Sequence, residues 1–266
     1  MWGYQINGIW QDVYLLALPK IHIEDVYVKP LVSKNMLEIE VTVQNQTAKK
    51  AEIQLQGDIR EWMNRAGTDI NSAPVPDWTL GNEALSVAPA KVSVATGTSQ
   101  KVTLQVPVGK DVLKYWTPEH PNLYALLLSV KNQKQTVDTK YERFGWREWT
   151  LQGTTQCLNG EPYALHGDSW HFMGIPQMTR RYAWAWFTAI KGMNANAVRP
   201  HAQVYPRFYL DMADEMGICV LNETANWASD GGPKLDSDLF WETSKSHLKR
   251  FVLRDRNHAV SYTHLR

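Results

Sequence analysis

The residues from Leu158 to Trp227 constrain the fold more than any other part of the chain. Three short apolar runs, at 163–168, 197–201 and 218–223, each end in polar residues. The segments between them are amphipathic and long enough for helices of about 10 to 15 residues. This alternation predicts parallel strands joined by right-handed crossovers. We therefore expect the opening part of an eight-stranded (β/α) barrel.

Helical periodicity marks three segments, which are 181–193, 205–216 and 240–258. In the first segment, Trp186, Ile190 and Met193 fall on one helical face, so we expect that face to be buried. The third segment follows Ser237 and Asp238, either of which can cap the first turn of a helix.

Polar and aromatic side chains gather where the three predicted strands end. In a (β/α) barrel, the C-terminal strand ends and the loops after them build the active site. The candidate substrate-binding residues are Asp168, His171, Arg199, His201, Asn222, Glu223 and Trp227. We expect Asp168, Arg199 and Glu223 to converge at one end of the sheet. For the two histidines and Trp227, a structural role in the loops stays open as the alternative.

Five motifs occur in order: Leu158-Asn-Gly-Glu-Pro, Leu165-His-Gly-Asp-Ser-Trp-His, Asn196-Ala-Val-Arg-Pro-His, Ala213-Asp-Glu-Met-Gly-Ile-Cys-Val-Leu-Asn-Glu and Leu253-Arg-Asp-Arg-Asn-His. Each is weak alone, but together they resemble the barrel of family 2 glycoside hydrolases, the β-galactosidase, β-glucuronidase and β-mannosidase group. The resemblance implies a retaining exo-β-glycosidase that works with two carboxylates.

The resemblance also implies where those carboxylates lie. The family's acid/base glutamate ends the fourth barrel strand, and its nucleophile lies near the end of the seventh. Glu223 ends the third strand, so neither catalytic glutamate is expected in this chain. We expect Arg199 to position a catalytic carboxylate, because a guanidinium offers five donors in a planar fork. Glu223 then supports Arg199 or a neighbouring loop, and His171 lines the sugar pocket.

Before the barrel, alternating apolar and polar residues from about Pro19 to Trp146 predict an antiparallel sandwich of the immunoglobulin type. We expect an irregular insertion from Arg60 to Ala90 and a short strand pair within 150–159. The β-prone run at 8–17 lacks a partner strand, and in the resembling family such a run closes an N-terminal jelly-roll domain. The expected boundaries are 1–18 for that strand, 19–147 for the sandwich, 148–259 for part of the barrel and 260–266 for a non-native tail.

The tail has a separate explanation. Ser261-Tyr-Thr-His-Leu-Arg266 matches one reading frame of a transposon adapter used in sequencing libraries. The sequence of the gene beyond His258 would decide whether the tail is native. A continuation that ends in Asn-Glu favours the enzyme. A natural stop codon favours the rival hypothesis, a non-catalytic carbohydrate-binding or interaction protein with a degenerate barrel.

The composition restricts the partners. A net charge of +1, with 21% charged residues scattered singly, gives no reason to expect nucleic acid or an anionic membrane as a partner. No apolar run approaches the roughly 20 residues of a membrane span. The expected partner is a β-linked oligosaccharide or glycoside, whether galactoside, glucuronide or mannoside, and a homo-oligomer of the full-length parent stays open as an alternative to a monomer. The residues do not decide the cellular compartment.

We expect no metal and no cofactor. His166, His171 and His201 are spread over two strands without the close spacing of a zinc site. The two cysteines, Cys157 and Cys219, lie far apart in the chain, and we expect both to be reduced and structural.

Overall fold

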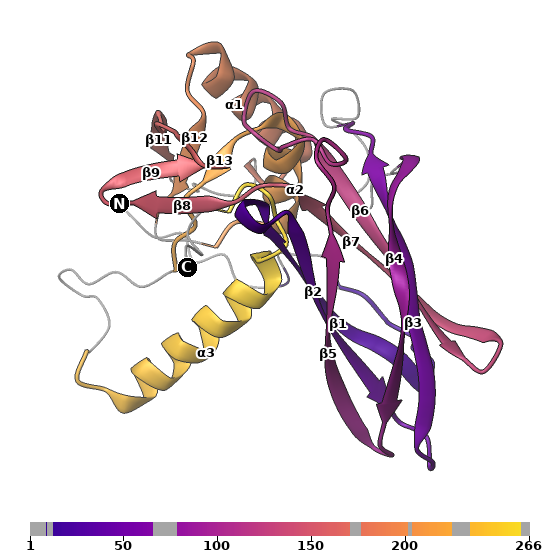
Figure 1. The fold of residues 1–266 in the computed structure, drawn as a ribbon. Helices are drawn as coiled ribbons and strands as arrows, with labels where there is room; N and C mark the ends of the chain where they lie inside the picture. Colours follow the sequence, from indigo (N-terminus) through magenta and orange to yellow (C-terminus); the bar gives the residue numbers. More distant parts are fainter. Residues whose placement is uncertain are drawn as a thin grey trace. The chain divides into compact units, whose positions relative to one another are not determined.

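The computed structural model describes residue 9 and residues 13–65, 79–170, 177–201, 204–224 and 235–261. The chain forms two compact units. One comprises Val13–Asn64 and Asp77–Pro162, and the other comprises Met1–Asp12, Arg65–Pro76 and Tyr163–Arg266. Figure 1 shows the strands of the first unit and the helices of the second.

The first unit contains two antiparallel sheets. The smaller has the order β1-β2-β5, with β1 at Ile21–Leu31, β2 at Met36–Asn45 and β5 at Thr98–Pro107. The larger has the order β4-β3-β6-β7, with β3 at Ala51–Trp62, β4 at Leu80–Val94, β6 at Leu123–Asn132 and β7 at Gln135–Gly145. A short 3-10 turn, Val32–Lys34, separates β1 from β2. The predicted antiparallel sandwich is confirmed.

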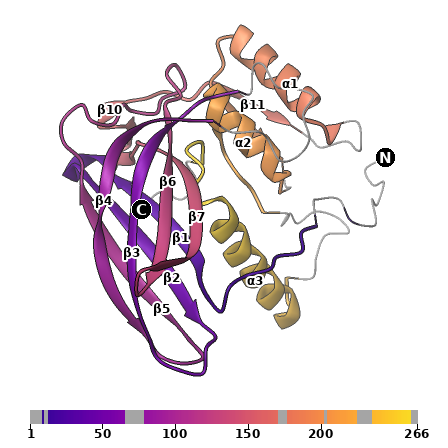
Figure 2. The same ribbon diagram turned by 90° about the vertical axis from the view of Figure 1, so that its right-hand side faces the viewer.

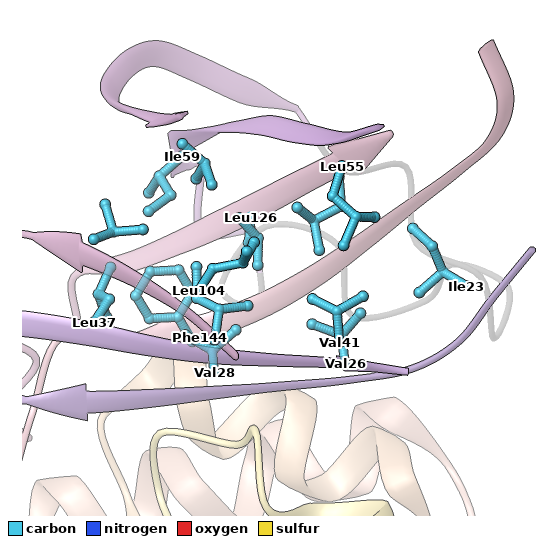
Figure 3. Close-up of a cluster of buried hydrophobic side chains, with 14 of the residues drawn as sticks. Ile23, Val26, Val28, Leu37, Val41, Leu55, Ile59, Leu104, Leu126 and Phe144 are labelled. Carbon is cyan, nitrogen blue, oxygen red and sulfur yellow. The ribbon is translucent and has the colours of Figure 1, made fainter. Parts of the chain in front are cut away.

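Alternation along the strands explains why these sheets pack face to face. In β2, Leu37, Ile39, Val41 and Val43 are fully buried and alternate with more exposed neighbours. Successive side chains of a strand point to opposite faces, so this pattern gives one apolar face and one polar face. Figure 3 shows side chains from both sheets meeting between them, among them Leu126. That cluster is the core of the sandwich.

The prediction of an irregular insertion from Arg60 to Ala90 is wrong at both of its ends. Strand β3 continues to Trp62 and β4 already begins at Leu80, while residues 66–78 lie outside the described residues. The β3–β4 ladder contains register shifts between Leu55 and Gly57 and around Arg60, which break the strict alternation in sequence. Pro89 is tolerated because β4 is an edge strand.

A small sheet of order β10-β9-β8 belongs to the same compact unit. Its strands are β8 at Trp149–Gln152, β9 at Thr155–Leu158 and β10 at Glu161–Pro162. The strand pair expected within 150–159 is therefore present. Glu148 and Asn159 hold its base together: Asn159 N donates to Glu148 O at 2.8 Å, and Glu148 N donates to Asn159 Oδ1 at 2.9 Å. Ser33 N donates to Glu148 Oε2 at 2.7 Å, which ties this sheet to the sandwich.

The second unit contains a parallel sheet of order β11-β12-β13 with connecting helices (Figure 2). In chain order its elements are β11 at Gly167–Trp170, α1 at Arg180–Gly192, β12 at Ala197–Pro200, α2 at Arg207–Met216, β13 at Cys219–Val220 and α3 at Asp238–Asp255. The predicted parallel strands are confirmed. Gly167 is needed for the first pairing, because a Cβ there would lie 2.5 Å from the carbonyl oxygen of Ala197.

Packing between α1 and α2 follows most of the predicted pattern. Trp186 and Ile190 are buried on α1, and Trp186 stacks with Phe187 at a ring distance of 5.1 Å. The placement of Met193 on the same buried face is wrong, because this residue is 67% exposed. The helix ends at Gly192, so Met193 is its C-cap and no longer follows the helical spacing.

Of the two residues proposed as the cap of helix α3, Ser237 and Asp238, the structure uses the first. Ser237 is the N-cap, and its side chain accepts a hydrogen bond from Phe240 N at 3.4 Å. Among the residues that the structure describes, none of the helices is both long and apolar enough to span a membrane.

Candidate functional site

The register of the parallel sheet decides which side chains share a face. Val198 of β12 lies beside Val220 of β13, and both line a small pocket with aromatic residues of α1 and α2. That face of the sheet is therefore the helix-covered face. Arg199 follows Val198 directly, so its side chain leaves the opposite face of the sheet.

Arg199 and Glu223 meet on this opposite face. Arg199 Nε donates to Glu223 Oε1 at 2.5 Å, and the two side chains are 41% and 27% exposed. Glu223 lies in the loop after β13. Because β13 runs parallel to β12, this loop begins beside the end of β12. The predicted convergence therefore holds for these two residues. Because both are partly exposed, we expect the ion pair to add little to stability and to serve mainly to orient the two groups.

Asp168 does not join that pair. The register places it beside Val198, whereas Arg199 lies beside Ser169. Since side chains alternate along a strand, Asp168 and Arg199 leave opposite faces of the sheet. The carboxylate of Asp168 instead accepts a hydrogen bond from Ser169 N at 2.7 Å.

The other predicted site residues differ in their surroundings. His201 follows β12 directly and is partly exposed. Asn222 is only 8% exposed, and its Nδ2 has no hydrogen-bond partner within the described part of the chain. His171 and Trp227 lie outside the described residues.

A second polar cluster, which the sequence analysis did not single out, lies between α2 and the turn after α3. Asp214 is 2% exposed and His258 is 5% exposed, with 2.6 Å between Asp214 Oδ2 and His258 Nδ1. The other carboxylate oxygen, Oδ1, accepts a hydrogen bond from Val260 N at 3.0 Å. Both residues belong to motifs quoted above, and a charged residue at an otherwise apolar helix face was the signal that could have revealed the pair.

Charges around His258 shift its protonation. Burial alone lowers the pKa of this imidazole, but the neighbouring carboxylates of Asp214, Asp211 and Asp255 raise it by more, so the pKa lies above its usual value. Asp211, Asp214 and His258 bring potential ligand atoms within 4.8 Å of one another. Both oxygens of Asp214 already accept hydrogen bonds, so the cluster is explained as a structural ion pair and we propose no metal there.

Comparison with known proteins agrees with this architecture. The model of the family "Glycosyl hydrolases family 2" matches residues 21–147. The chain is 31% identical over 185 residues to a putative beta-glucuronidase of Formosa agariphila, covering 66% of this chain and 18% of that protein. It is 26% identical over 226 residues to a beta-galactosidase of Priestia megaterium, covering 83% of this chain and 20% of that protein.

Among solved structures, a family 2 beta-galacturonidase from Eisenbergiella tayi bound to galacturonate matches with a TM-score of 0.72 and 18% identity, over 92% of this chain and 40% of that one. The fold thus defines a class of proteins in which a β-sandwich precedes parallel β/α units. Within that class, the matches point to glycoside hydrolase family 2, whose family model covers the sandwich of this chain. It spans about a fifth of the length of the two curated relatives named above.

Proposed function

We propose that this chain is part of a retaining exo-β-glycosidase, and that Arg199 and Glu223 lie at the edge of its sugar pocket. The observation that carries this proposal is the Arg199–Glu223 contact at the C-terminal ends of neighbouring parallel strands. In (β/α) barrels that edge of the sheet holds the active site. The family match supplies the reaction class, the hydrolysis of β-glycosidic bonds.

The proposed mechanism uses two carboxylates about 5 to 5.5 Å apart, one as nucleophile at the anomeric carbon and one as acid and then base. Neither glutamate is assigned to a residue of this chain. Arg199 has five N–H donors, and its Nε donates to Glu223. The donors at the end of the guanidinium are suited to hold a catalytic carboxylate, while Glu223 fixes the plane of the fork.

The substrate contacts are proposed at the remaining candidates as well, which are Asp168, His171, His201, Asn222 and Trp227. The relatives are a putative beta-glucuronidase and a beta-galactosidase. We favour a β-galactoside, with a β-glucuronide or β-mannoside as alternatives. Among these residues, the register turns Asp168 to the face of the sheet opposite to Arg199, so the two do not share a subsite.

We infer the domain assignment from the family. Residues 1–18 form the last strand of a jelly-roll domain, 19–147 an immunoglobulin-like sandwich, 148–259 part of a (β/α) barrel and 260–266 a non-native tail. The first two residues of that tail, Val260 and Ser261, are nevertheless buried in the β/α unit, where Ser261 bridges to Val220 of β13. Residues 13–18 form no strand in this structure, and the exposure of the apolar Leu15 and Leu16 fits a segment that pairs with strands of a longer protein. Sequencing the gene beyond His258 tests the last; native sequence running on through residue 266 would contradict it.

The function is tested on the longer protein encoded by that gene. Its release of nitrophenol from aryl β-galactosides, β-glucuronides and β-mannosides is measured for the wild type and for Arg199→Ala, Arg199→Lys and Arg207→Ala. Loss of Arg199 should lower kcat by about a hundredfold, because it removes a preorganised charged donor. Arg207 is exposed at the start of α2 and serves as the matched control. Full activity in Arg199→Ala would refute the role of the pair.

A further inference from the structure

We propose that the outer face of the four-stranded sheet β4-β3-β6-β7 carries a second carbohydrate site, which binds neutral β-linked oligosaccharides. A hollow of about 650 Å³ lies on this face, and its lining includes Gln56, Asp58, Leu127 and Tyr141. Ligand sites typically have volumes of about 300 to 1,000 Å³. All of the lining residues belong to the sandwich unit, so the site goes beyond the function proposed above and does not depend on it.

The strand register shows how the hollow is built. Ser86, Asp58, Leu127 and Tyr141 lie side by side across the four strands, because Asp58 pairs with Ser86 and Leu127, and Leu127 pairs with Tyr141. All four therefore point to the same outer face, opposite to the core. Tyr141 is 45% exposed, so with Leu127 it offers a small apolar platform on the β6–β7 side of the sheet.

A second row runs parallel to this platform and is made of uncharged hydrogen-bonding groups. Gln56 pairs with Ser129, and Ser129 pairs with Thr139. Gln54 Nε2 donates to Gln56 Oε1 at 3.2 Å, which fixes the orientation of the Gln56 amide. An aromatic ring beside a row of amide and hydroxyl groups matches a sugar ring, which has an apolar face and a polar edge.

The charges of the hollow select against acidic sugars. Asp58 Oδ2 accepts hydrogen bonds from Arg60 Nε and Nη2 at 3.0 and 2.8 Å, so this carboxylate is neutralised by a fixed partner. Glu83 also lines the hollow and is exposed. Lys140 lines it too, but its Nζ donates to Glu24 O at 3.1 Å. Asp58 and Glu83 are balanced by Arg60 and Lys140, so the hollow carries no excess positive charge that would attract a uronate, and we expect it to favour neutral sugars.

The size of the apolar platform also argues for a glycan over a protein. A stable protein interface buries roughly 800 Å² on each partner around a dry apolar centre. Here the apolar lining consists of a few side chains, Val87, Pro89, Leu127, Leu128 and Tyr141, which lie among polar groups.

The test uses the whole chain carried on a glutathione transferase fusion, run by native electrophoresis through gels that contain β-galactan, β-mannan, xylan or polygalacturonate. We expect retardation in at least one neutral gel and none in polygalacturonate. Tyr141→Ala and Gln56→Ala should each raise the dissociation constant about tenfold. Tyr115→Ala should leave it unchanged, since Tyr115 is 49% exposed on another part of the sandwich.

The outcomes separate this site from the proposed catalytic pocket. Arg199→Ala should not alter the retardation; if it abolishes retardation while Tyr141→Ala does not, the sugar binds in the β/α unit and the proposal is wrong. The proposal is also wrong if no neutral gel retards the wild type, if Tyr115→Ala weakens binding as much as Tyr141→Ala, or if polygalacturonate is bound instead. Circular dichroism of each variant identifies any loss that is due to unfolding.

Discussion

Breaking the buried Asp214–His258 pair should loosen the β/α unit far more than the sandwich. In Asp214→Ala, His258 keeps a buried position without its anion and Val260 N loses its acceptor. Removing one partner of a buried ion pair typically costs about 3 to 5 kcal/mol. At about 1.4 kcal/mol per factor of ten, the population of open states should rise by at least a hundredfold.

The chain contains its own reporters for this experiment. Cys219 in β13 and Cys157 in β9 are both fully buried, and they belong to different compact units. Their alkylation by iodoacetamide can be followed separately by peptide mass spectrometry. In Asp214→Ala, the labelling of Cys219 should accelerate about a hundredfold while that of Cys157 stays unchanged. Asp236→Ala, at an exposed position before α3, is the control that should change neither rate.

The pH dependence of the same measurement follows from the raised pKa of His258. A histidine whose folded pKa exceeds the ordinary value of about 6.5 adds stability that is fully present below about pH 6.5. That stability is lost as the pH rises through the higher folded value. The protection of Cys219 relative to Cys157 should therefore fall with rising pH in the wild type, and this fall should be smaller in Asp214→Ala, where Asp211 and Asp255 still face His258. Equal labelling of Cys219 in wild type and variant would refute the structural role of the pair.

Three further predictions concern activity and packing. The chain as given should release no nitrophenol from aryl β-glycosides, because neither catalytic carboxylate is assigned to one of its residues; turnover that is lost in Glu223→Gln would contradict this. It should also be poorly soluble without a fusion, because the exposed apolar segment at 13–18 favours association. Leu126→Ala should destabilise the sandwich by about 2 to 5 kcal/mol in urea unfolding followed by circular dichroism, since Leu126 is fully buried in its core, whereas Leu151→Ala, at a 61% exposed position, should change little. Gly167→Ala should weaken the β11–β12 pairing, because the new Cβ would clash with Ala197 O; hydrogen exchange at Ala197 that matches the wild type would contradict this.

Patterns that repeat along the chain were enough to predict the two kinds of sheet. The alternation in β2 and the spacing of the apolar runs after Tyr163 are local features. A period of two residues fits a half-buried strand, and short apolar runs separated by amphipathic segments fit parallel strands with connecting helices. Ser237 as a cap and the parallel pairing of β11, β12 and β13 follow from the same kind of information. The contact of Arg199 with Glu223 was also predictable, because Arg199 lies near the end of β12 and Glu223 shortly after the adjacent β13.

The tertiary structure decided what depends on register and on contacts between distant segments. Bulges near Gly57 and Arg60 let β3 and β4 continue where the sequence pattern is broken. Asp168 pairs with Val198, one residue before Arg199. Because the side-chain period of a strand is two, Asp168 and Arg199 therefore leave opposite faces of the sheet. Asp214 and His258 are 44 residues apart in the chain. Their pairing is fixed by the packing of α2 against the turn after α3, so only the folded chain could show it.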